Sequence, residues 1–216
     1  KLVSNSNFTA KRIKKYWGRS STIIHPPVDI KKFSPNKSRG DFYLSVSRLV
    51  PNKRIDLLVK AFNQLNLPLI IVGNGPEKKQ LMKIARDNIR FLNYQDDLAV
   101  KKLMEKCRAF VYAGTEDFGI APVEAMAAGA PIIALKKAGI LDTVNCINSK
   151  NKIPTGIFFN NQSDRDLREC INFFEEKKLW LEFSSEDINL WAQNFSIENF
   201  KNKFSNLIDK SLAELK

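Results

Sequence analysis

The sequence has little of what metal sites and disulfide frameworks need. It contains one histidine, His25, and three cysteines, none of them in C-x-x-C spacing. An odd number of cysteines leaves one thiol unpaired in any disulfide scheme, so we expect three reduced thiols in a cytosolic protein. We also expect no bound metal, because histidine and cysteine are the usual zinc ligands. His25 precedes two prolines, which favours a structural role over a catalytic one.

Long apolar runs are also missing. No stretch approaches the roughly 18 apolar residues of a transmembrane helix, and no signal peptide is visible. The chain does not begin with methionine, so we expect a fragment of a longer protein. Its 216 residues, of which 44% are hydrophobic, suffice for one large domain with a real core.

Acidic residues are nearly absent from the first forty. This stretch has ten Lys and Arg residues against the single acid Asp29, which accounts for +9 of the net charge of +12. Such a basic end favours an anionic partner: a membrane surface, a nucleic acid or a phosphorylated substrate. A helix predicted from about Asn7 to Trp17 would carry much of this charge, as an ordinary solvated face or as a membrane-surface face. Nucleic acid is disfavoured, because no recognised nucleic-acid module is present.

From residue 41 onwards, strands and helices alternate regularly. Short apolar runs predict six strands, at residues 42–46, 69–72, 89–92, 109–112, 132–135 and 156–159. Amphipathic patterns predict helices between them, at residues 55–65, 76–87, 97–106 and 140–146. The alternation predicts an α/β, Rossmann-like parallel sheet with helices on both faces and a helical C-terminal tail. We divide the chain into a basic linker segment at 1–40, a sheet domain at 41–195 and a last helix at 196–216.

The stretch Thr115–Pro131, TEDFGIAPVEAMAAGAP, predicts a loop and a helix after a buried strand. Pro122 suits a first helical turn and Gly129 a helix C-cap, so the helix N-terminus should open outward and attract an anion. Glu116 and Glu124 could accept hydrogen bonds from sugar hydroxyls on either side of it, so a phosphate joined to a polyol is the expected ligand. The alternative is that Glu124 only favours the helix dipole and Glu116 is a solvated loop residue.

The residues around these two glutamates resemble a motif of a known protein family. The string E-D-F-G-I-A-P-V-E-A-M-A-A-G-A-P-I-I-A resembles the E-x7-E segment of retaining glycosyltransferases of the GT-B fold, family 4. The resemblance runs from about Asn5 to Phe204 and matches the C-terminal, donor-binding half of such enzymes. It is strongest to mannosyltransferases of bacterial surface-polysaccharide or lipopolysaccharide assembly. The N-terminal, acceptor-binding half is absent from this sequence.

The resemblance implies roles for two basic residues and two amides. Family 4 enzymes clamp the donor diphosphate with an Arg and a Lys five residues apart, and Arg48 and Lys53 match these positions. The backbone amides of Ile120 and Ala121 would complete the diphosphate site. Cations at strand ends can neutralise a leaving diphosphate without a metal ion. The alternative is a solvated basic loop.

The resemblance also implies different roles for the two glutamates. It implies that Glu124 holds the ribose hydroxyls and that Glu116 holds hydroxyls of the transferred sugar. The amides of Phe118 and Gly119 would face that sugar. With Arg48 and Lys53, Glu116 forms the expected catalytic set.

Five weaker matches are expected to line the donor cleft: Gly73, Gly75, Leu92, Asn93 and Gly139. The V-G-x-G-P turn that holds the first two could equally be a tight turn without ligand contact. Asn93 replaces a more usual glycine. Ala138 and Asp142 depart from the G-G-x-x-E pattern that the family often has there, which puts the donor contacts of that loop in doubt.

The resemblance implies retaining transfer from a nucleotide sugar, with GDP-mannose the expected donor, to a glycan or lipid-linked acceptor. No metal or other cofactor is expected. Because only one half is present, we expect the isolated chain to be inactive, and we place the enzyme in the cytoplasm, at the inner face of the membrane. The alternative is a non-catalytic nucleotide-sugar-binding module that regulates or scaffolds an assembly complex.

Overall fold

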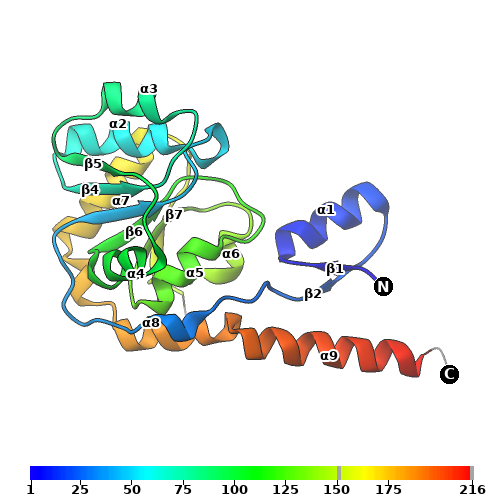
Figure 1. The fold of residues 1–216 in the computed structure, drawn as a ribbon. Helices are drawn as coiled ribbons and strands as arrows, with labels where there is room; N and C mark the ends of the chain where they lie inside the picture. The colour runs from blue at the N-terminus through cyan, green and yellow to red at the C-terminus, as the bar shows by residue number, and fades with distance from the viewer. Residues whose placement is uncertain (150–151, 215–216) are drawn as a thin grey trace.

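A six-stranded parallel sheet forms the centre of the computed structural model, which describes residues 1–149 and 152–214 (Figure 1). In sheet order the strands are β5 (Ile89–Leu92), β4 (Leu69–Val72), β3 (Tyr43–Val46), β6 (Ala109–Tyr112), β7 (Ile132–Leu135) and β8 (Gly156–Phe159). Within this sheet the chain forms β3 first and then adds β4 and β5 on one side of it. It then returns to add β6, β7 and β8 on the other side. This is the Rossmann order, with its reversal between β3 and β6.

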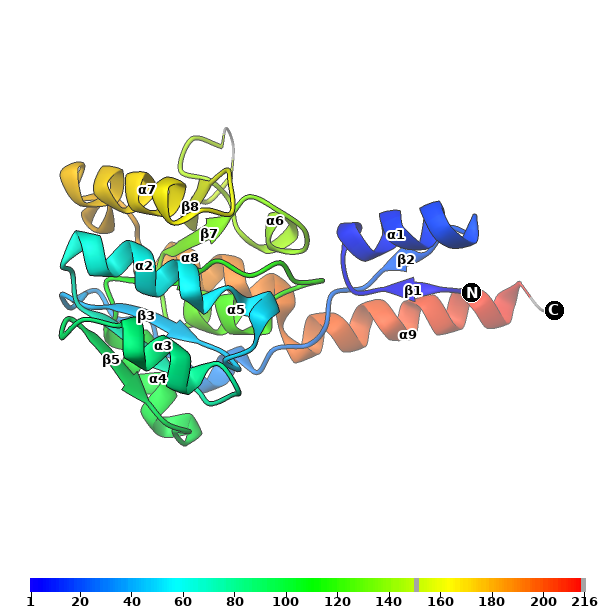
Figure 2. The ribbon, with the colours of Figure 1, turned by 90° about the horizontal axis from the view of Figure 1, so that it is seen from above.

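Helices cover both faces of the sheet (Figures 1 and 2). One face carries α2 (Ile55–Leu65), α3 (Lys78–Ile84) and α7 (Asp164–Glu176). The other carries α4 (Asp97–Lys106), α5 (Ile120–Ala127) and α8 (Ser185–Ala192). A short helix, α6 (Ile140–Thr143), follows β7 at the carboxyl edge of the sheet. The predicted fold class is therefore confirmed.

Apolar strands explain why this sheet is covered on both sides. Every residue of β6 and β7 is buried, which is typical of parallel strands packed between two helical layers. Burying each large apolar side chain fully contributes about 1.5–3 kcal/mol. Tyr43 of β3 shows one such contact, since its ring packs edge-on against Phe62 of α2 and Phe174 of α7, at 5.2 and 6.3 Å.

The N-terminal segment forms a small unit beside the sheet domain. It consists of β1 (Val3–Ser4), α1 (Asn7–Trp17) and β2 (Thr22–Ile23), and the two strands pair in parallel. Figures 1 and 2 both show this unit standing out from the domain, alongside the long last helix, α9 (Ile197–Ala213). Among the described residues, no helix is both long and apolar enough to cross a membrane.

Two helices are shorter than the sequence predicts. The one predicted at 76–87 spans only Lys78–Ile84, because Ala85 takes an extended conformation. The one predicted at 140–146 ends at Thr143, because the backbone then extends and Cys146 forms a bridge with Gly156. The three cysteines are free thiols, as expected, and Cys107 is fully buried.

Candidate functional site

The loop after β6 leads into α5, as the sequence predicts. Gly119 has a φ of 94°, a conformation that glycine adopts without strain, and α5 begins at the next residue without a side-chain cap. Its first amides are therefore available to a ligand at the end that attracts anions. The helix ends at Ala127, and Gly129 follows in a left-handed conformation with its N–H bonded to the Met126 carbonyl at 2.8 Å.

The main cavity, about 690 Å³, lies at this helix start. It brings together six of the predicted site residues: Lys53, Glu116, Phe118, Gly119, Ile120 and Ala121. They come from the segments that follow β3 and β6, namely two loops and the first turn of α5, and the sheet order reverses between these two strands. Parallel sheets bind their ligands at such a point, outside the carboxyl ends of the strands.

Lys53 and Glu116 form an ion pair inside this cavity. Both side chains are about a fifth to a quarter exposed, so the pair is largely shielded from solvent. Burial and the nearby Arg48 guanidinium lower the pKa of Lys53. A diphosphate that entered the cavity would compete with Glu116 for the Lys53 ammonium.

Glu124 lies in a second cavity, of about 470 Å³, together with Lys32 and Asp97. Burial raises the pKa of Glu124 above the ordinary glutamate value; the Lys32 ammonium lowers this pKa and the Asp97 carboxylate raises it. Lys32 Nζ lies 3.3 Å from Asp97 Oδ2. Sequence reasoning missed Lys32 and Asp97, because they lie far from Glu124 in the chain and match no motif.

A third cavity, of about 330 Å³, is lined by Arg48, Gly73 and Tyr94. Val46, the last residue of β3, lines all three cavities, so they adjoin one another around the carboxyl end of that strand. Arg48, Glu116 and Glu124 therefore share one continuous edge of the sheet. This is the arrangement that a ligand with a base, a ribose, a diphosphate and a sugar would need.

Four of the predicted residues are not among those lining the three cavities: Gly75, Leu92, Asn93 and Gly139. Their contacts are within the protein. A side chain at Gly75 would collide with the Leu49 carbonyl, and the Leu92 carbonyl accepts a hydrogen bond from the Gly73 amide at 3.1 Å. The Asn93 side chain accepts one from the Lys78 ammonium.

Gly139 acts on the site through the loop. Its N–H donates to the Glu116 carbonyl at 2.9 Å, and a side chain there would collide with the Asp117 backbone. Gly139 therefore supports the loop that carries Glu116, although the three cavities do not include it.

Two hydroxyl groups were missed by sequence reasoning. Tyr112 ends β6 and Ser47 follows β3, and both line the main cavity. Their hydroxyl oxygens are buried without a hydrogen-bond partner among the described residues, and burial raises the pKa of Tyr112. An unpaired buried hydroxyl costs about 1–3 kcal/mol, so a ligand group or a bound water that paired with either one would stabilise the site. Their place at strand ends on the carboxyl edge was the available signal.

His25 has the structural role predicted for it. Its ring stacks on Phe118 at 5.4 Å and meets the edge of Phe195 at 5.5 Å. Its Nδ1 lies 2.9 Å from the Asn5 carbonyl oxygen. The ring thus joins the N-terminal unit to the loop of the main cavity, and Asn5 itself lines that cavity.

A family comparison agrees with this geometry. The family model "Glycosyl transferases group 1" matches residues 28–188, which is most of the chain. The chain belongs to this family. The range contains the β3 and β6 loops and all three cavities except their N-terminal contributions from Asn5 and Pro26.

Mannosyltransferases are among the relatives of this chain. It is 33% identical over 175 residues to a GDP-mannose-dependent monoacylated alpha-(1-6)-phosphatidylinositol monomannoside mannosyltransferase of Corynebacterium glutamicum, which covers 66% of this chain and 46% of the relative. It is 28% identical over 199 residues to the alpha-1,3/1,6-mannosyltransferase ALG2 of Saccharomyces cerevisiae, with 66% and 40% covered. The chain spans about half the length of the curated relatives it matches.

Solved structures share the fold of this chain. HepE of Anabaena in complex with UDP has a TM-score of 0.82 at 21% identity, over 96% of this chain and 63% of that one. Sucrose-phosphate synthase of Thermosynechococcus elongatus has a TM-score of 0.81 at 20% identity, over 98% and 58%. The fold is that of a GT-B glycosyltransferase domain.

The two departures from the expected G-G-x-x-E pattern have structural consequences. Ala138 has a φ of 63°, a left-handed conformation that costs a non-glycine residue about 1–2 kcal/mol. Asp142 accepts hydrogen bonds from the Asn7 N–H at 2.6 Å and from the Asn7 side chain at 3.3 Å. Its carboxylate thus holds the start of α1 instead of a ligand in the cavities.

The described residues contain no cluster of three or more histidine, cysteine, aspartate or glutamate side chains that could hold a metal ion. The groups that this chain offers to an anion include Arg48, Lys53 and the amides at the start of α5.

Proposed function

We propose that this chain is the donor-binding half of a retaining glycosyltransferase, and that its donor is a nucleotide sugar, GDP-mannose by our expectation. One observation carries the proposal: two cations, an open helix N-terminus and two carboxylates lie along one carboxyl edge of the sheet. The Corynebacterium relative is named as GDP-mannose-dependent, which supports GDP-mannose as the donor.

The diphosphate would lie between Lys53, Arg48 and the start of α5. Negative charge builds on the diphosphate as the glycosidic bond breaks, and fixed cations and amides stabilise that charge without reorganising. Lys53 would exchange Glu116 for the diphosphate, which releases the Glu116 carboxylate towards the sugar. No metal ion takes part in this proposal.

The two carboxylates would then hold different parts of the donor. Glu124, half-buried in the second cavity, would accept hydrogen bonds from the ribose hydroxyls. Glu116, in the main cavity beside Gly119, would accept them from the transferred sugar. Only the second contact is close to the bond that breaks, so only it changes as the reaction proceeds.

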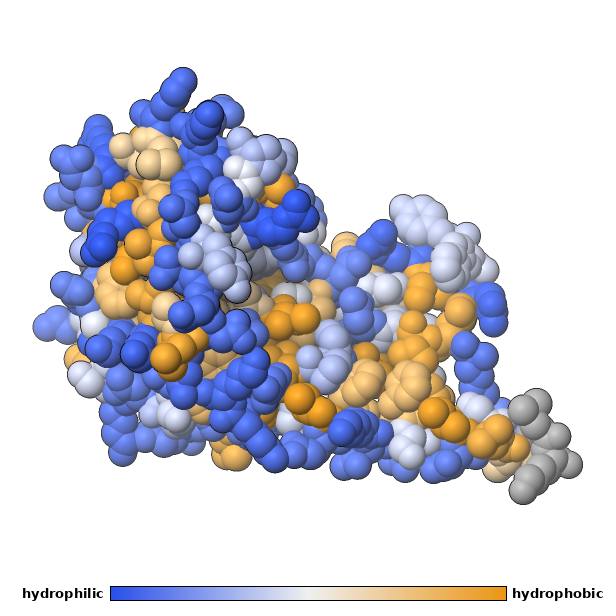
Figure 3. Space-filling model, viewed as in Figure 1, coloured by the Kyte–Doolittle hydropathy of each residue, from blue (hydrophilic) through white to orange (hydrophobic). Residues whose placement is uncertain are grey.

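We infer that an acceptor-binding half covers the exposed apolar side chains of α9 and the open edge of β1. Four large apolar side chains of α9 are 38–56% exposed: Ile197, Phe204, Ile208 and Leu212. Figure 3 shows hydrophobic residues gathered along this helix. A pair of two-residue parallel strands is too small to be stable alone, and β1 pairs on one side only.

The acceptor would be a glycan or a lipid-linked glycan, bound by that other half. The Corynebacterium relative is named for a phosphatidylinositol mannoside acceptor, which supports a lipid-linked one. We therefore place the reaction in the cytoplasm, at the inner face of a membrane.

Thermal unfolding of the 216-residue chain with a panel of nucleotides tests the donor proposal. A donor at about one hundred times its Kd should stabilise the chain by about 2.7 kcal/mol, because it binds only the folded state. GDP-mannose and GDP should raise the Tm more than UDP-glucose or free mannose. Arg48→Ala should reduce the shift, whereas Arg165→Ala on the exposed side of α7 should leave it unchanged.

The proposal fails if no nucleotide sugar raises the Tm, or if Arg48→Ala and the parent respond equally. A shift with UDP-glucose alone would keep the donor-binding role and overturn the choice of GDP-mannose.

A further inference from the structure

The outer end of α1 combines unpaired cations with exposed aromatic rings. Four basic residues of this surface are exposed: Lys11, Lys14, Lys15 and Arg19. Among the described residues, the only cation of α1 in an ion pair is Arg12, which lies 2.9 Å from Asp117. The first acidic residue of the sequence is Asp29, so nothing nearby along the chain compensates the charge.

Two aromatic side chains lie among these cations. Tyr16 is 69% exposed and Trp17 is 66% exposed, although both are large enough to stabilise a core if they were buried. Lys15 lies over the Tyr16 ring, with its Nζ 5.2 Å from the ring centroid. We call this set the α1 surface; it comprises Lys11, Lys14, Lys15, Tyr16, Trp17 and Arg19.

The α1 surface lies at the outer end of the helix and borders the loop of the main cavity. α1 begins beside the sheet domain, where Asp142 holds Asn7, and ends at the outer side of the N-terminal unit (Figure 1). Figure 3 shows the outer end of α1 standing clear of the sheet domain. Tyr16 and Trp17 also line a small cavity with Asp117, a residue of the main cavity, so a partner on the α1 surface would lie next to the cavity that contains Glu116.

We propose that the α1 surface docks the protein on an anionic lipid bilayer. The charge is complementary to anionic headgroups, and tyrosine and tryptophan are the side chains that favour the boundary between headgroups and acyl chains. Each Lys or Arg near such a surface strengthens binding about fivefold. Four cations with two rings give reversible, salt-sensitive attachment, which brings the cavities close to a lipid-linked acceptor. The docking goes beyond the transfer reaction and does not depend on it.

Sedimentation of the whole chain with vesicles tests this proposal. We expect binding to phosphatidylcholine vesicles that contain about 30% phosphatidylglycerol, and none to phosphatidylcholine alone. Raising the salt from 0.05 to 0.5 M should abolish binding, because the screening length falls to a few ångströms. Lys11→Glu with Lys15→Glu should weaken binding by at least about 30-fold.

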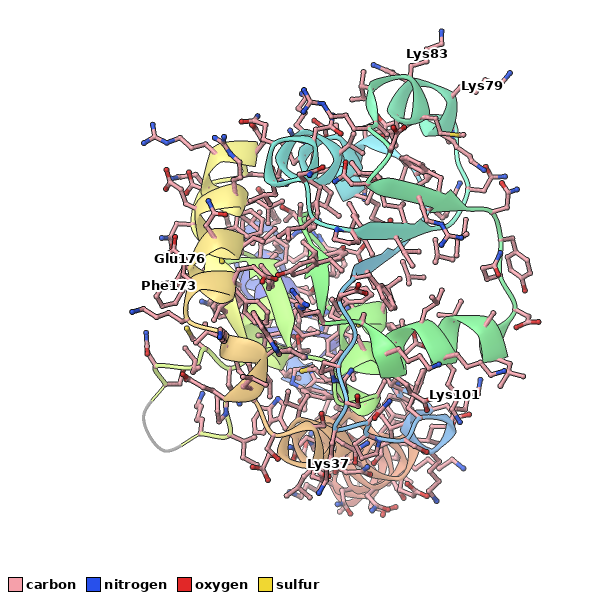
Figure 4. All side chains as sticks on the ribbon, turned by 90° about the vertical axis from the view of Figure 1, so that its left-hand side faces the viewer. Lys37, Lys79, Lys83, Lys101, Phe173 and Glu176 are labelled. Carbon is pink, nitrogen blue, oxygen red and sulfur yellow. The ribbon has the colours of Figure 1, made fainter. Side chains whose placement is uncertain are left out.

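The control is a second pair of exposed lysines four residues apart. Lys79 and Lys83 lie on α3, where Figure 4 shows both pointing outward. Lys79→Glu with Lys83→Glu changes the net charge by the same amount and should retain most of the binding. Equal loss in both double variants would show an effect of net charge only and would overturn the proposal.

The aromatic pair supplies the second readout. Tyr16→Ser with Trp17→Ser should weaken vesicle binding at low salt although it leaves the net charge unchanged, and the parent's tryptophan emission should shift to the blue on binding. Binding to neutral vesicles as strong as to anionic ones would contradict the proposal. So would retention on single-stranded RNA without any vesicle binding, since the partner would then be a nucleic acid.

Discussion

The buried Tyr112 hydroxyl has no hydrogen-bond partner among the residues that the structure describes. Tyr112→Phe should raise the free energy of unfolding by about 1–3 kcal/mol, because it removes an unpaired buried polar group. It should also weaken donor binding about two- to tenfold, the usual net worth of one hydrogen bond. Calorimetric affinities and denaturant unfolding measure the two effects.

Tyr43→Phe is the matched control, since the Tyr43 hydroxyl donates to Glu175 on the far side of β3 from the cavities. It should lower stability and leave donor affinity alone. If Tyr112→Phe behaves in the same way, the Tyr112 hydroxyl serves the fold and not a ligand.

Burial makes Glu124 costly to the folded protein at neutral pH. Its pKa is raised on folding, so its contribution to stability is fully present below the unfolded value of about 4.5 and is lost as the pH rises through the folded-state pKa. Glu124→Gln should therefore raise the Tm at pH 7 and change it little at pH 4. The same substitution should weaken donor binding at pH 7.

Thermal unfolding at both pH values measures the first effect. A Tm that falls at pH 7 would show that the Glu124 carboxylate stabilises the protein, which contradicts the effect of burial on its pKa. The charged Glu124 carboxylate thus lowers the stability of the ligand-free protein, and we expect it to be kept because ligand binding needs it.

At the scale of elements, the turn before α6 supports the loop of the main cavity. Gly139→Ala would drive a methyl group into the Asp117 backbone, so it should cost about 1–3 kcal/mol and displace the loop that holds Glu116. Donor affinity should fall with it. Ala138→Gly is the neighbouring control: it relieves a left-handed alanine and should change stability by about 0 to +1 kcal/mol.

Denaturant unfolding and donor titration of both variants measure these effects. If Gly139→Ala binds donor as well as the parent, the turn does not position the loop.

Strands and capped helices were predictable because their signals are local. The six strands of the sheet occur where apolar runs predict them, and Ser163 and Ser196 cap their helices through the next turn's amides. Helix ends near Ala85 and Thr143 were misplaced, because tertiary contacts and not local residues end those helices.

The cavities were predictable only where a motif marks them. The E-x7-E stretch located Glu116 and Glu124, but nothing in the sequence brings Asn5 or Lys32 to the same edge. Those contacts depend on how the N-terminal unit and the segment that follows it pack against the sheet domain. The Lys53–Glu116 ion pair was also missed, because the resemblance assigns the two groups to different parts of one donor.

At the scale of the whole molecule, the chain should bind a donor and transfer nothing. Its cavities lie along the carboxyl edge of one sheet, and the chain spans about half the length of its curated relatives. Placing the acceptor and excluding water would both need the proposed acceptor-binding half. Incubation with GDP-mannose and a lipid-linked glycan, followed by mass spectrometry, checks this; robust glycan extension by the 216-residue chain would contradict it.

The central claim is that the carboxyl edge of this sheet binds the nucleotide of a donor sugar, and calorimetric titration of GDP into the chain tests it most directly. Glu124→Ala removes a charged hydrogen-bond acceptor and should weaken binding by about ten- to a hundredfold. Glu176→Ala, on α7 at the opposite side (Figure 4), should leave the Kd unchanged. Equal GDP affinity in the parent and both variants, or no GDP binding by any of them, would contradict the account.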